Sequence, residues 1–318
     1  MSASPVPFLA RPTFYYDRKA ALLAGVYGAG MGILPVLAAK HFGASKMQIA
    51  LLGSAPSASY LATLYWGHFV RQRRKLPVVV IAWSLARGLF LVIGLLTHLW
   101  PIILLACLSY FINAAAVPAY NAIWRHNYPT EVRGYLVGRV VRGNVMVIAV
   151  CTLVFGWLLD ADPRLYRVLF PLAGACGVAA AMVFRRVKVR RDFPAAEADR
   201  ERFHLGRALG LVLRNRTFAK YLLAFFISGF GNLMSQPMLV VFLNEQFEAT
   251  YKEQAVVRFL PLVLQLALLP FWGRVADRLN PMAMRAVLGL FLGCLLYTSD
   301  AADEGSGVDL GGRRIIKK

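Results

Sequence analysis

Charged residues are scarce in this sequence, and acidic residues are the scarcest. Only 16% of the 318 residues are Asp, Glu, Lys or Arg, whereas soluble proteins carry about 25%. Hydrophobic residues make up 58% of the chain, and the mean hydropathy is +0.55. A soluble core cannot bury this much apolar surface, so the lack of charge excludes a soluble globular protein and indicates a chain embedded in lipid.

Groups for metal, redox or nucleotide chemistry are lacking as well. The four cysteines show no metal-binding or redox spacing, and no two of the five histidines stand four residues apart. The stretch GVYGAGMG at 25–32 lies within an apolar run with no strand before it, so it indicates close helix packing rather than a phosphate loop. We expect neither a metal nor a cofactor.

Long apolar runs recur along the chain, each near the roughly 20 residues that span a bilayer. They predict an all-α integral membrane protein of about eight or nine transmembrane helices. The complete helices are expected near residues 20–39, 47–69, 76–97, 101–123, 138–159, 165–184, 218–243 and 255–272, and a ninth begins near 282.

Basic residues outnumber acidic ones by 36 to 16, for a formal charge of +20. Through residue 293, the gaps and helix ends on the side of the N-terminus hold 25 Lys and Arg, and those on the opposite side hold 6, among them Arg258. The positive-inside rule therefore predicts a cytoplasmic N-terminus, in what we expect to be a bacterial cytoplasmic membrane. Topology explains the positive charge, so we expect a lipid bilayer and no nucleic acid as partner.

A basic segment in the middle of the chain divides the apolar runs into two sets. Its apolar and basic residues interleave, which predicts an amphipathic helix on the membrane face, with a solvated linker as the alternative. The expected organisation is a cytoplasmic N-terminus at 1–19, a six-helix half at 20–184, the linker at 185–217, the start of a second half at 218–293, and a non-native tail at 294–318.

The second set of helices repeats a feature of the first. PFWGRVADRLNP at 270–281 has a fainter echo in LYWGHFVRQRRKLP at 64–77, and the two tryptophans, Trp66 and Trp272, stand 206 residues apart. Parallel six-helix halves are the plan of one large class of transporters. The offset therefore predicts an intact protein of roughly 400 residues and about twelve helices.

The residues of these loops resemble the major facilitator superfamily. Gly273, Asp277 and Arg278 in GRVADR resemble its loop signature Gly-x-x-x-Asp-Arg-x-Gly-Arg-Arg, and PTEVRGYLVG at 129–138 is also similar to this family. The first-half loop departs from the signature, because Arg71 stands where the family has Asp. The resemblance implies loops that latch the cytoplasmic ends of the helices; the alternative is that their charges merely set topology. The residues so assigned to gating are Gly67, Arg71, Arg133, Gly134, Gly273, Asp277 and Arg278.

The pattern of the last 25 residues is not typical of a membrane helix. From Cys294 the apolar run turns abruptly polar, although half a helix in lipid leaves backbone groups without partners. CLLYTSDAADE and GVDLGGRRII are translations of DNA that resembles a transposase-type sequencing adapter. We expect residues 294–318 to be an artefact and the native chain to continue.

Polar residues inside the helices are the candidates for a substrate cavity. Arg87 is the one basic residue placed well inside a predicted helix, where a charge costs about 3 kcal/mol and usually faces a cavity or a partner. Its alternative role is structural, bonding backbone carbonyls. The amide candidates flank prolines, and each could instead join helices. They are Asn113, Asn121, Asn232 and Gln236.

The sequence shows no Asp or Glu inside the eight complete predicted helices. Proton-coupled transport often uses such a carboxylate, so any coupling ion must be served by missing helices or by another residue type. The predicted function is a monomeric secondary transporter that moves a small solute by alternating access. Because Arg87 has no visible acidic partner, we favour an amphiphilic or organic-anion solute and lean towards efflux. The alternatives are a polytopic membrane enzyme, and a transporter-like receptor or scaffold that moves nothing.

Overall fold

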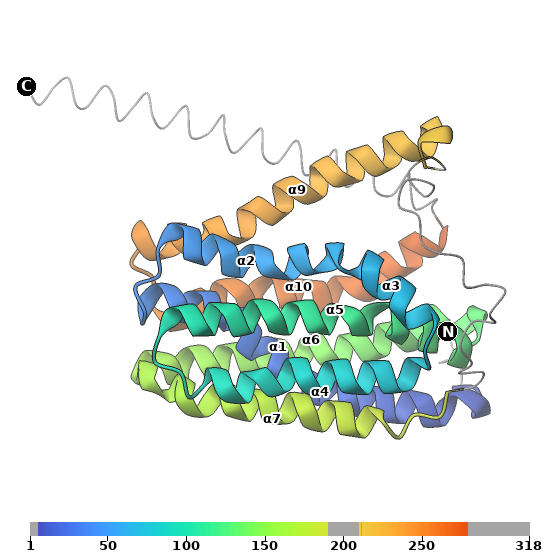
Figure 1. Ribbon diagram of the computed structural model, residues 1–318, viewed down its shortest axis with the longest axis horizontal. Coiled ribbons are helices and arrows are strands. Elements are labelled where there is room, and N and C mark those ends of the chain that lie inside the picture. Colours follow the sequence, from blue (N-terminus) through green and yellow to red (C-terminus); the bar gives the residue numbers. More distant parts are fainter. Residues whose placement is uncertain (1–5, 190–209, 211, 279–318) are drawn as a thin grey trace, which may run out of the picture. The chain divides into compact units, whose positions relative to one another are not determined.

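The computed structural model describes residues 6–189, 210 and 212–278, and all their regular structure is helical (Figure 1). The all-α prediction is therefore confirmed for this part of the chain, and each of the eight complete segments predicted from apolar runs is mainly helical. The helices are α1 (Arg11–Lys40), α2 (Lys46–Leu61), α3 (Thr63–Arg71), α4 (Lys75–Ile93), α5 (Leu99–Asn127), α6 (Thr130–Ala161), α7 (Tyr166–Phe184), α9 (Arg216–Glu245) and α10 (Tyr251–Arg278). The expected ninth transmembrane helix and the 294–318 tail lie outside the described residues.

Among the helical segments that the structure describes, five are long and apolar enough to cross a membrane: Arg11–Lys40, Lys75–Ile93, Leu99–Asn127, Val132–Ala161 and Pro163–Phe184. Their outward faces carry large apolar side chains, such as Leu104 at 65% exposure and Val168 at 63%. A soluble protein would bury these side chains, whereas hydrocarbon solvates them. The protein is an integral membrane protein.

The prediction of one unbroken helix over 47–69 is wrong, because the helix breaks at Ala62 into α2 and α3. Pro56 lies inside α2 and has no N–H for the helical ladder. The hydroxyls of Ser59 and Thr63 donate to the carbonyls of Pro56 and Tyr60, at 2.5 Å each, and such back-bonding bends helices. The apolar pattern shows none of these local bonds.

Helices α1 and α6 begin earlier than expected, at Arg11 and Thr130 instead of 20 and 138. In α1 a proline in the first turn suits the start of a helix, and the residues FYYDR continue the backbone ladder. A hydropathy pattern does not count such polar turns as part of the helix, although their backbones form the same helical hydrogen bonds. As a consequence Asp17 lies inside α1. Asp160 lies in the last turn of α6, because that helix ends at Ala161 rather than at 159. The expectation that no acidic residue lies inside a helix is therefore wrong.

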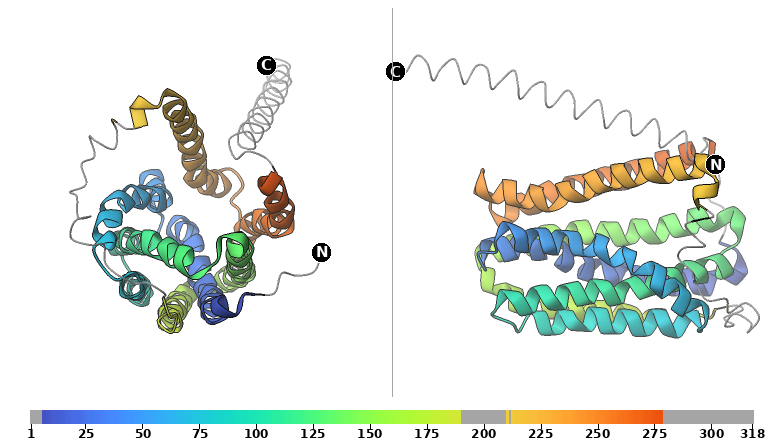
Figure 2. Two further views of the ribbon diagram at one scale, coloured as in Figure 1. Left: turned by 90° about the vertical axis from the view of Figure 1, so that its right-hand side faces the viewer. Right: turned by 45° about the horizontal axis from the view of Figure 1, so that its top comes forward.

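Apart from α3, which continues from the end of α2 (Figure 1), each helix runs opposite to the one before it, and many are seen nearly end-on in the left view of Figure 2. We call the end where α1 begins the Asp17 end, and the end where α1 finishes the Lys40 end. Helix α4 packs on α5 and α7, α1 packs on α6 and α7, and α2 packs on α5 and α9. One buried cluster with Leu37, Ile93 and Phe170 lies toward the Lys40 end, and a second with Val79 and Phe184 lies toward the Asp17 end. Arg87, the charged candidate on α4, lies between these two clusters, because its neighbour Tyr27 belongs to the first and Trp83 to the second.

Candidate functional site

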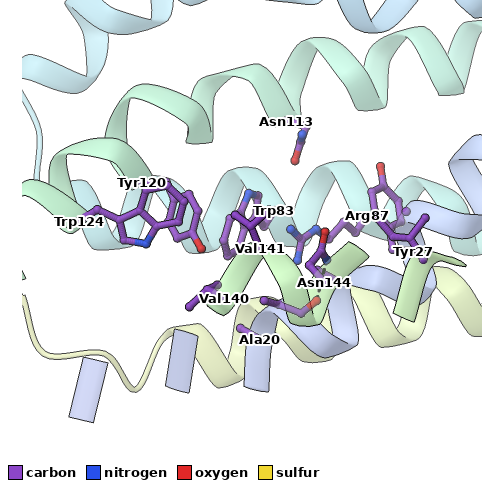
Figure 3. Close-up of a pocket in the computed structure, with 14 residues that line it drawn as sticks. Ala20, Tyr27, Trp83, Arg87, Asn113, Tyr120, Trp124, Val140, Val141 and Asn144 are labelled. Atoms are coloured by element: carbon purple, nitrogen blue, oxygen red, sulfur yellow. Dashed lines mark hydrogen bonds between the residues drawn. The ribbon is translucent and has the colours of Figure 1, made fainter. Parts of the chain in front are cut away.

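A cavity of about 270 Å³ lies inside the first half, between α1, α4, α5 and α6 (Figure 3). Its wall is mostly apolar, with aromatic rings and a few polar groups. Such a lining is typical of a site for a small molecule. The lining residues are Ala20, Ala21, Ala24, Tyr27, Gly28, Trp83, Arg87, Asn113, Tyr120, Trp124, Val140, Val141, Asn144 and Ile148.

Arg87 lines the cavity from α4 and is only 5% exposed. Its guanidinium carbon lies 4.2 Å from the Trp83 ring centre and 5.6 Å from that of Tyr27, so the cation rests on two aromatic faces. Its Nη1 donates to the Gly177 carbonyl of α7 at 3.1 Å. Within the described residues, no carboxylate lies at salt-bridge distance from it. A buried charge without a counter-charge is costly, and the aromatic faces and one carbonyl offset only part of that cost.

Two polar atoms in the cavity wall have no hydrogen-bond partner among the described residues. They are Nε of Arg87, a donor, and Oδ1 of Asn113, an acceptor. Buried polar groups are normally paired, so each unpaired atom needs an explanation. A ligand that accepts at Arg87 and donates at Asn113 would satisfy both atoms.

A short hydrogen-bond chain fixes the aromatic ring beside Arg87. Ser109 Oγ donates to the Ala86 carbonyl at 2.8 Å, and it lies 2.9 Å from the Tyr27 hydroxyl. Because Ser109 uses its one proton on Ala86, the Tyr27 hydroxyl donates to Ser109. The chain links α1, α5 and α4, and it holds Tyr27 in place under the guanidinium.

Helix α7 approaches α4 closely at Gly177, where a Cβ would lie 2.9 Å from both Cβ and Cδ of Arg87. Gly177→Ala should therefore displace Arg87 and lower stability by about 1–3 kcal/mol, because an overpacked core must shift. Gly138→Ala is the matched control, since a Cβ there meets nothing within 4 Å and alanine favours a helix. Melting temperatures in detergent should fall for Gly177→Ala and stay level or rise for Gly138→Ala. Equal shifts would contradict the close packing.

A buried cluster of one carboxylate and three aromatic donors, which the sequence analysis missed, adjoins the cavity at the Asp17 end. Asp17 is 1% exposed and accepts three hydrogen bonds, two from α5 and one from the residue that follows it: Tyr120 Oη at 2.6 Å, Trp124 Nε1 at 2.8 Å and Tyr128 Oη at 2.9 Å. Tyr120 and Trp124 also line the cavity. The signal in the sequence is three ring donors at intervals of four, on one face of a helix.

A second cation, Arg258, is half-buried, and its place in the helix was also missed. The sequence analysis counted Arg258 with the basic residues at the outer helix ends, but it lies well inside α10, and its Nη1 donates to the Gly32 carbonyl of α1. Helix α10 begins at Tyr251, which brings Arg258 two turns into the helix. Arg87 is therefore not the only basic residue well inside a helix.

The remaining candidates for the cavity differ in their positions. Asn121 is exposed and does not line this cavity. The backbones of Asn232 and Gln236 belong to α9, and their side chains lie outside the described residues. Arg87 and Asn113 are thus the two candidates that the structure brings together, while a role in substrate binding stays a prediction.

The gating candidates lie mostly in helices rather than loops. Arg133, near the start of α6, donates to the carbonyls of Arg125 and Tyr128 and so caps the end of α5. Its neighbour Gly134 has open space around it, as does Gly67 of α3, so close helix approach does not explain either glycine. Arg71 is exposed in the last turn of α3.

The second-half signature falls in the last turns of α10. The backbones of Gly273, Asp277 and Arg278 are helical, and their side chains lie outside the described residues. Their role as a latch stays a prediction.

The two halves meet at the Lys40 end through polar contacts. Lys40 Nζ donates to the Ala249 carbonyl at 2.7 Å, and Lys46 pairs with Glu245 at 2.8 Å. Asp160 accepts from the first backbone N–H of α10, that of Tyr251, at 3.1 Å. A carboxylate at a helix N-terminus is stabilised by the helix dipole. These contacts join α1, α2 and α6 to α9 and α10.

Comparison with known proteins agrees with this architecture. The family model of the Major Facilitator Superfamily matches residues 20–303. The fold is similar to that of a bacterial homologue of the human lysosomal transporter Spinster in an inward-facing, unoccupied conformation, with a TM-score of 0.61 and 16% identity. That similarity covers 86% of this chain and 64% of the other, so this chain spans less than two thirds of that protein's length. No curated protein sequence matches it. Because the family match covers most of the sequence, the chain belongs to the major facilitator superfamily of membrane transporters.

Proposed function

We propose that this protein transports a small organic anion across the membrane by alternating access, and that it is not an enzyme. The observation that carries this proposal is Arg87, a buried cation in the wall of a cavity with no carboxylate partner among the described residues. Intramembrane charge that no protein group neutralises is typical of a substrate pathway. The structure describes two helices of the second half, α9 and α10, and the proposal assigns them to the same transport pathway.

The cavity wall indicates what else the solute carries. The Arg87 guanidinium would bind its anionic group through Nε, and Asn113 Oδ1 would accept a hydrogen bond from a hydroxyl or N–H of the solute. Trp83, Tyr120 and Trp124 offer an aromatic surface for an apolar part. An amphiphilic organic anion therefore satisfies the unpaired groups and covers the rings, which supports the preference drawn from the sequence.

Movement of the solute requires the contacts at the Lys40 end to break. Lys40, Lys46 and Asp160 hold the second half against the first there through polar contacts, and Lys40 also lies 5.6 Å from the Tyr251 ring centre. Apolar packing adds to these contacts, since Val240 and Tyr251 belong to the same buried cluster as Leu37. All of them join separate helices, so the halves can part without unfolding a helix. We propose rocking about the cavity between this state and one open at the Lys40 end. The gradient of the solute, together with that of any coupling ion, sets the direction of net transport.

The test compares two solutes that differ by one charge. The protein is reconstituted in liposomes, and uptake of 4-nitrobenzoate is measured beside that of uncharged 4-nitrobenzyl alcohol. We expect saturable uptake of the anion and only passive leakage of the alcohol. Asn113→Leu should lower the affinity about tenfold, because a buried hydrogen bond to the solute is lost. Asn121→Leu, on the same helix but exposed, should not change it.

Other outcomes separate the alternatives. Saturable binding without uptake would indicate a receptor or scaffold, and chemical conversion of the solute would indicate an enzyme. Equal effects of Asn113→Leu and Asn121→Leu would contradict the assignment of the cavity as the site.

A further inference from the structure

Arg258, which is half-buried and does not line the cavity itself, lies where the cavity walls continue toward the Lys40 end. On α1, the residues that line the cavity end with Tyr27 and Gly28. Gly32, which accepts the bond from Arg258, is one helical turn farther along the same face. Arg258 therefore contacts the wall about 6 Å beyond Gly28, by the rise of a helix.

Helix α5 leads to the same place. Its lining residues Trp124, Tyr120 and Asn113 are followed on that face by Tyr110, one turn nearer the Lys40 end. Tyr110 is half-buried and packs against the apolar cluster toward the Lys40 end. The α5 wall therefore runs toward the same end of the cavity as Gly32, whose carbonyl accepts the bond from the Arg258 guanidinium. That guanidinium belongs to the second half, whereas Arg87 belongs to the first.

Arg258 resembles Arg87 in its unbalanced charge. Among the described residues, no carboxylate lies at salt-bridge distance from it, and its Nη1 donates to the Gly32 carbonyl. A backbone carbonyl is a neutral acceptor, and an anion is a stronger partner for a guanidinium. An anion at this end of the cavity would therefore compete with Gly32 for Arg258.

We propose that Arg258 is a second anion-binding residue of the transport site, and that the anionic group of the solute replaces the Gly32 carbonyl as its partner. This inference rests on the proposed function, since it concerns the same solute. The exchange breaks a link between α10 and α1, two helices of different halves. The anion then favours the state in which the halves have parted at the Lys40 end. A ligand shifts such an equilibrium only through unequal affinity for the two states, and Arg258 supplies that difference.

The first measurement is binding to the purified chain in lipid nanodiscs. 4-Nitrobenzoate and 4-nitrophenyl phosphate quench tryptophan fluorescence, and Trp83 and Trp124 line the cavity as reporters. Uncharged 4-nitrobenzyl alcohol is the control solute. We expect Arg258→Gln to weaken binding of the anions about tenfold and Arg258→Lys less, because lysine keeps the charge. Lys252→Gln, which removes an exposed cation from the same helix, should leave binding unchanged.

The second measurement follows the link between the halves. Ala249 lies at the Lys40 end, is 6% exposed, and its carbonyl accepts a bond from Lys40. In a chain whose native cysteines are replaced, Ala249→Cys reports parting of the halves through its rate of alkylation. We expect the anions to raise this rate several-fold in the parent. In Arg258→Gln the rate should be high without anion and unresponsive to it.

The outcomes distinguish this inference from the proposed function. Weaker binding by Arg87→Gln with unchanged binding and anion-dependent alkylation in Arg258→Gln would overturn the inference and leave the proposed function standing. Failure of both anions to bind the parent saturably would overturn both. If Arg258→Gln does not fold, Arg258→Lys decides: unchanged anion affinity together with unchanged alkylation would overturn the role of Arg258.

Discussion

Replacing Asp17 with alanine should destabilise the protein more than any other single change considered for this chain. Three buried donors, the hydroxyls of Tyr120 and Tyr128 and the indole N–H of Trp124, would lose their shared acceptor. Each buried donor left without a partner costs about 1–3 kcal/mol, and entry of water offsets part of the sum. We expect a loss of about 3 kcal/mol or more in the free energy of unfolding. Thermal unfolding in detergent, followed by tryptophan fluorescence, measures it.

Asp17→Asn tests the chemistry of the cluster more finely. The amide keeps one oxygen for Trp124 and Tyr128, and its N–H₂ can donate to the Tyr120 hydroxyl, which accepts as well as donates. Its melting temperature should therefore lie between those of the parent and Asp17→Ala. Asp162→Ala is the control, since this exposed acid only caps a short helical turn through the Arg164 N–H. Equal melting temperatures for Asp17→Ala and Asp162→Ala would show that the cluster contributes nothing to stability.

Replacing Arg87 with glutamine should abolish most anion binding while preserving the fold. A charge-assisted hydrogen bond in a buried site contributes about 1.5–3 kcal/mol, which corresponds to an affinity about 10- to 100-fold lower without it. Glutamine also removes a buried charge that has no counter-charge among the described residues, so its effect on stability is small or favourable. Binding of 4-nitrobenzoate and the melting temperature should be measured on the same preparation.

The combination of the two measurements decides between a functional and a structural Arg87. A structural role rests on its bond to Gly177 and its packing on Trp83, so loss of the side chain would lower the melting temperature. A functional role lowers affinity with the melting temperature unchanged. Arg87→Lys should fall between the parent and Arg87→Gln in affinity, because it keeps the charge but loses the planar contact with Trp83. Normal affinity with a lowered melting temperature would contradict the proposed anion site.

The membrane fold follows from local properties of the sequence. Apolar runs near the length of a bilayer can satisfy their backbone in lipid only as helices, so the order of the helices is readable without any contact. The loop residues around Gly273 and Arg133 also indicate the family, and the match of the family model over residues 20–303 confirms it. Arg87 was identifiable because a charge inside an apolar run is costly wherever its partner lies.

The partners of polar residues depend on tertiary structure. Asp17 lies in a polar flank where hydropathy ends the helix, and its three donors are more than a hundred residues away on α5. Asn113 and Asn121 occupy one helix, but eight residues turn it by about 80° beyond two full turns. Packing alone therefore decides that Asn113 lines the cavity and Asn121 is exposed.

The sequence by itself determined the membrane environment, the helical fold and the family, because each depends on composition, run length and short local motifs. Only the tertiary structure decided which groups surround each charged side chain. It placed Arg87 and the unpaired Asn113 in one cavity and fixed Asp17 among aromatic donors. It also brought Arg258 of the second half against α1. The physical reason is that a hydrogen bond acts over about 3 Å in space, while the residues it joins can stand anywhere along the chain.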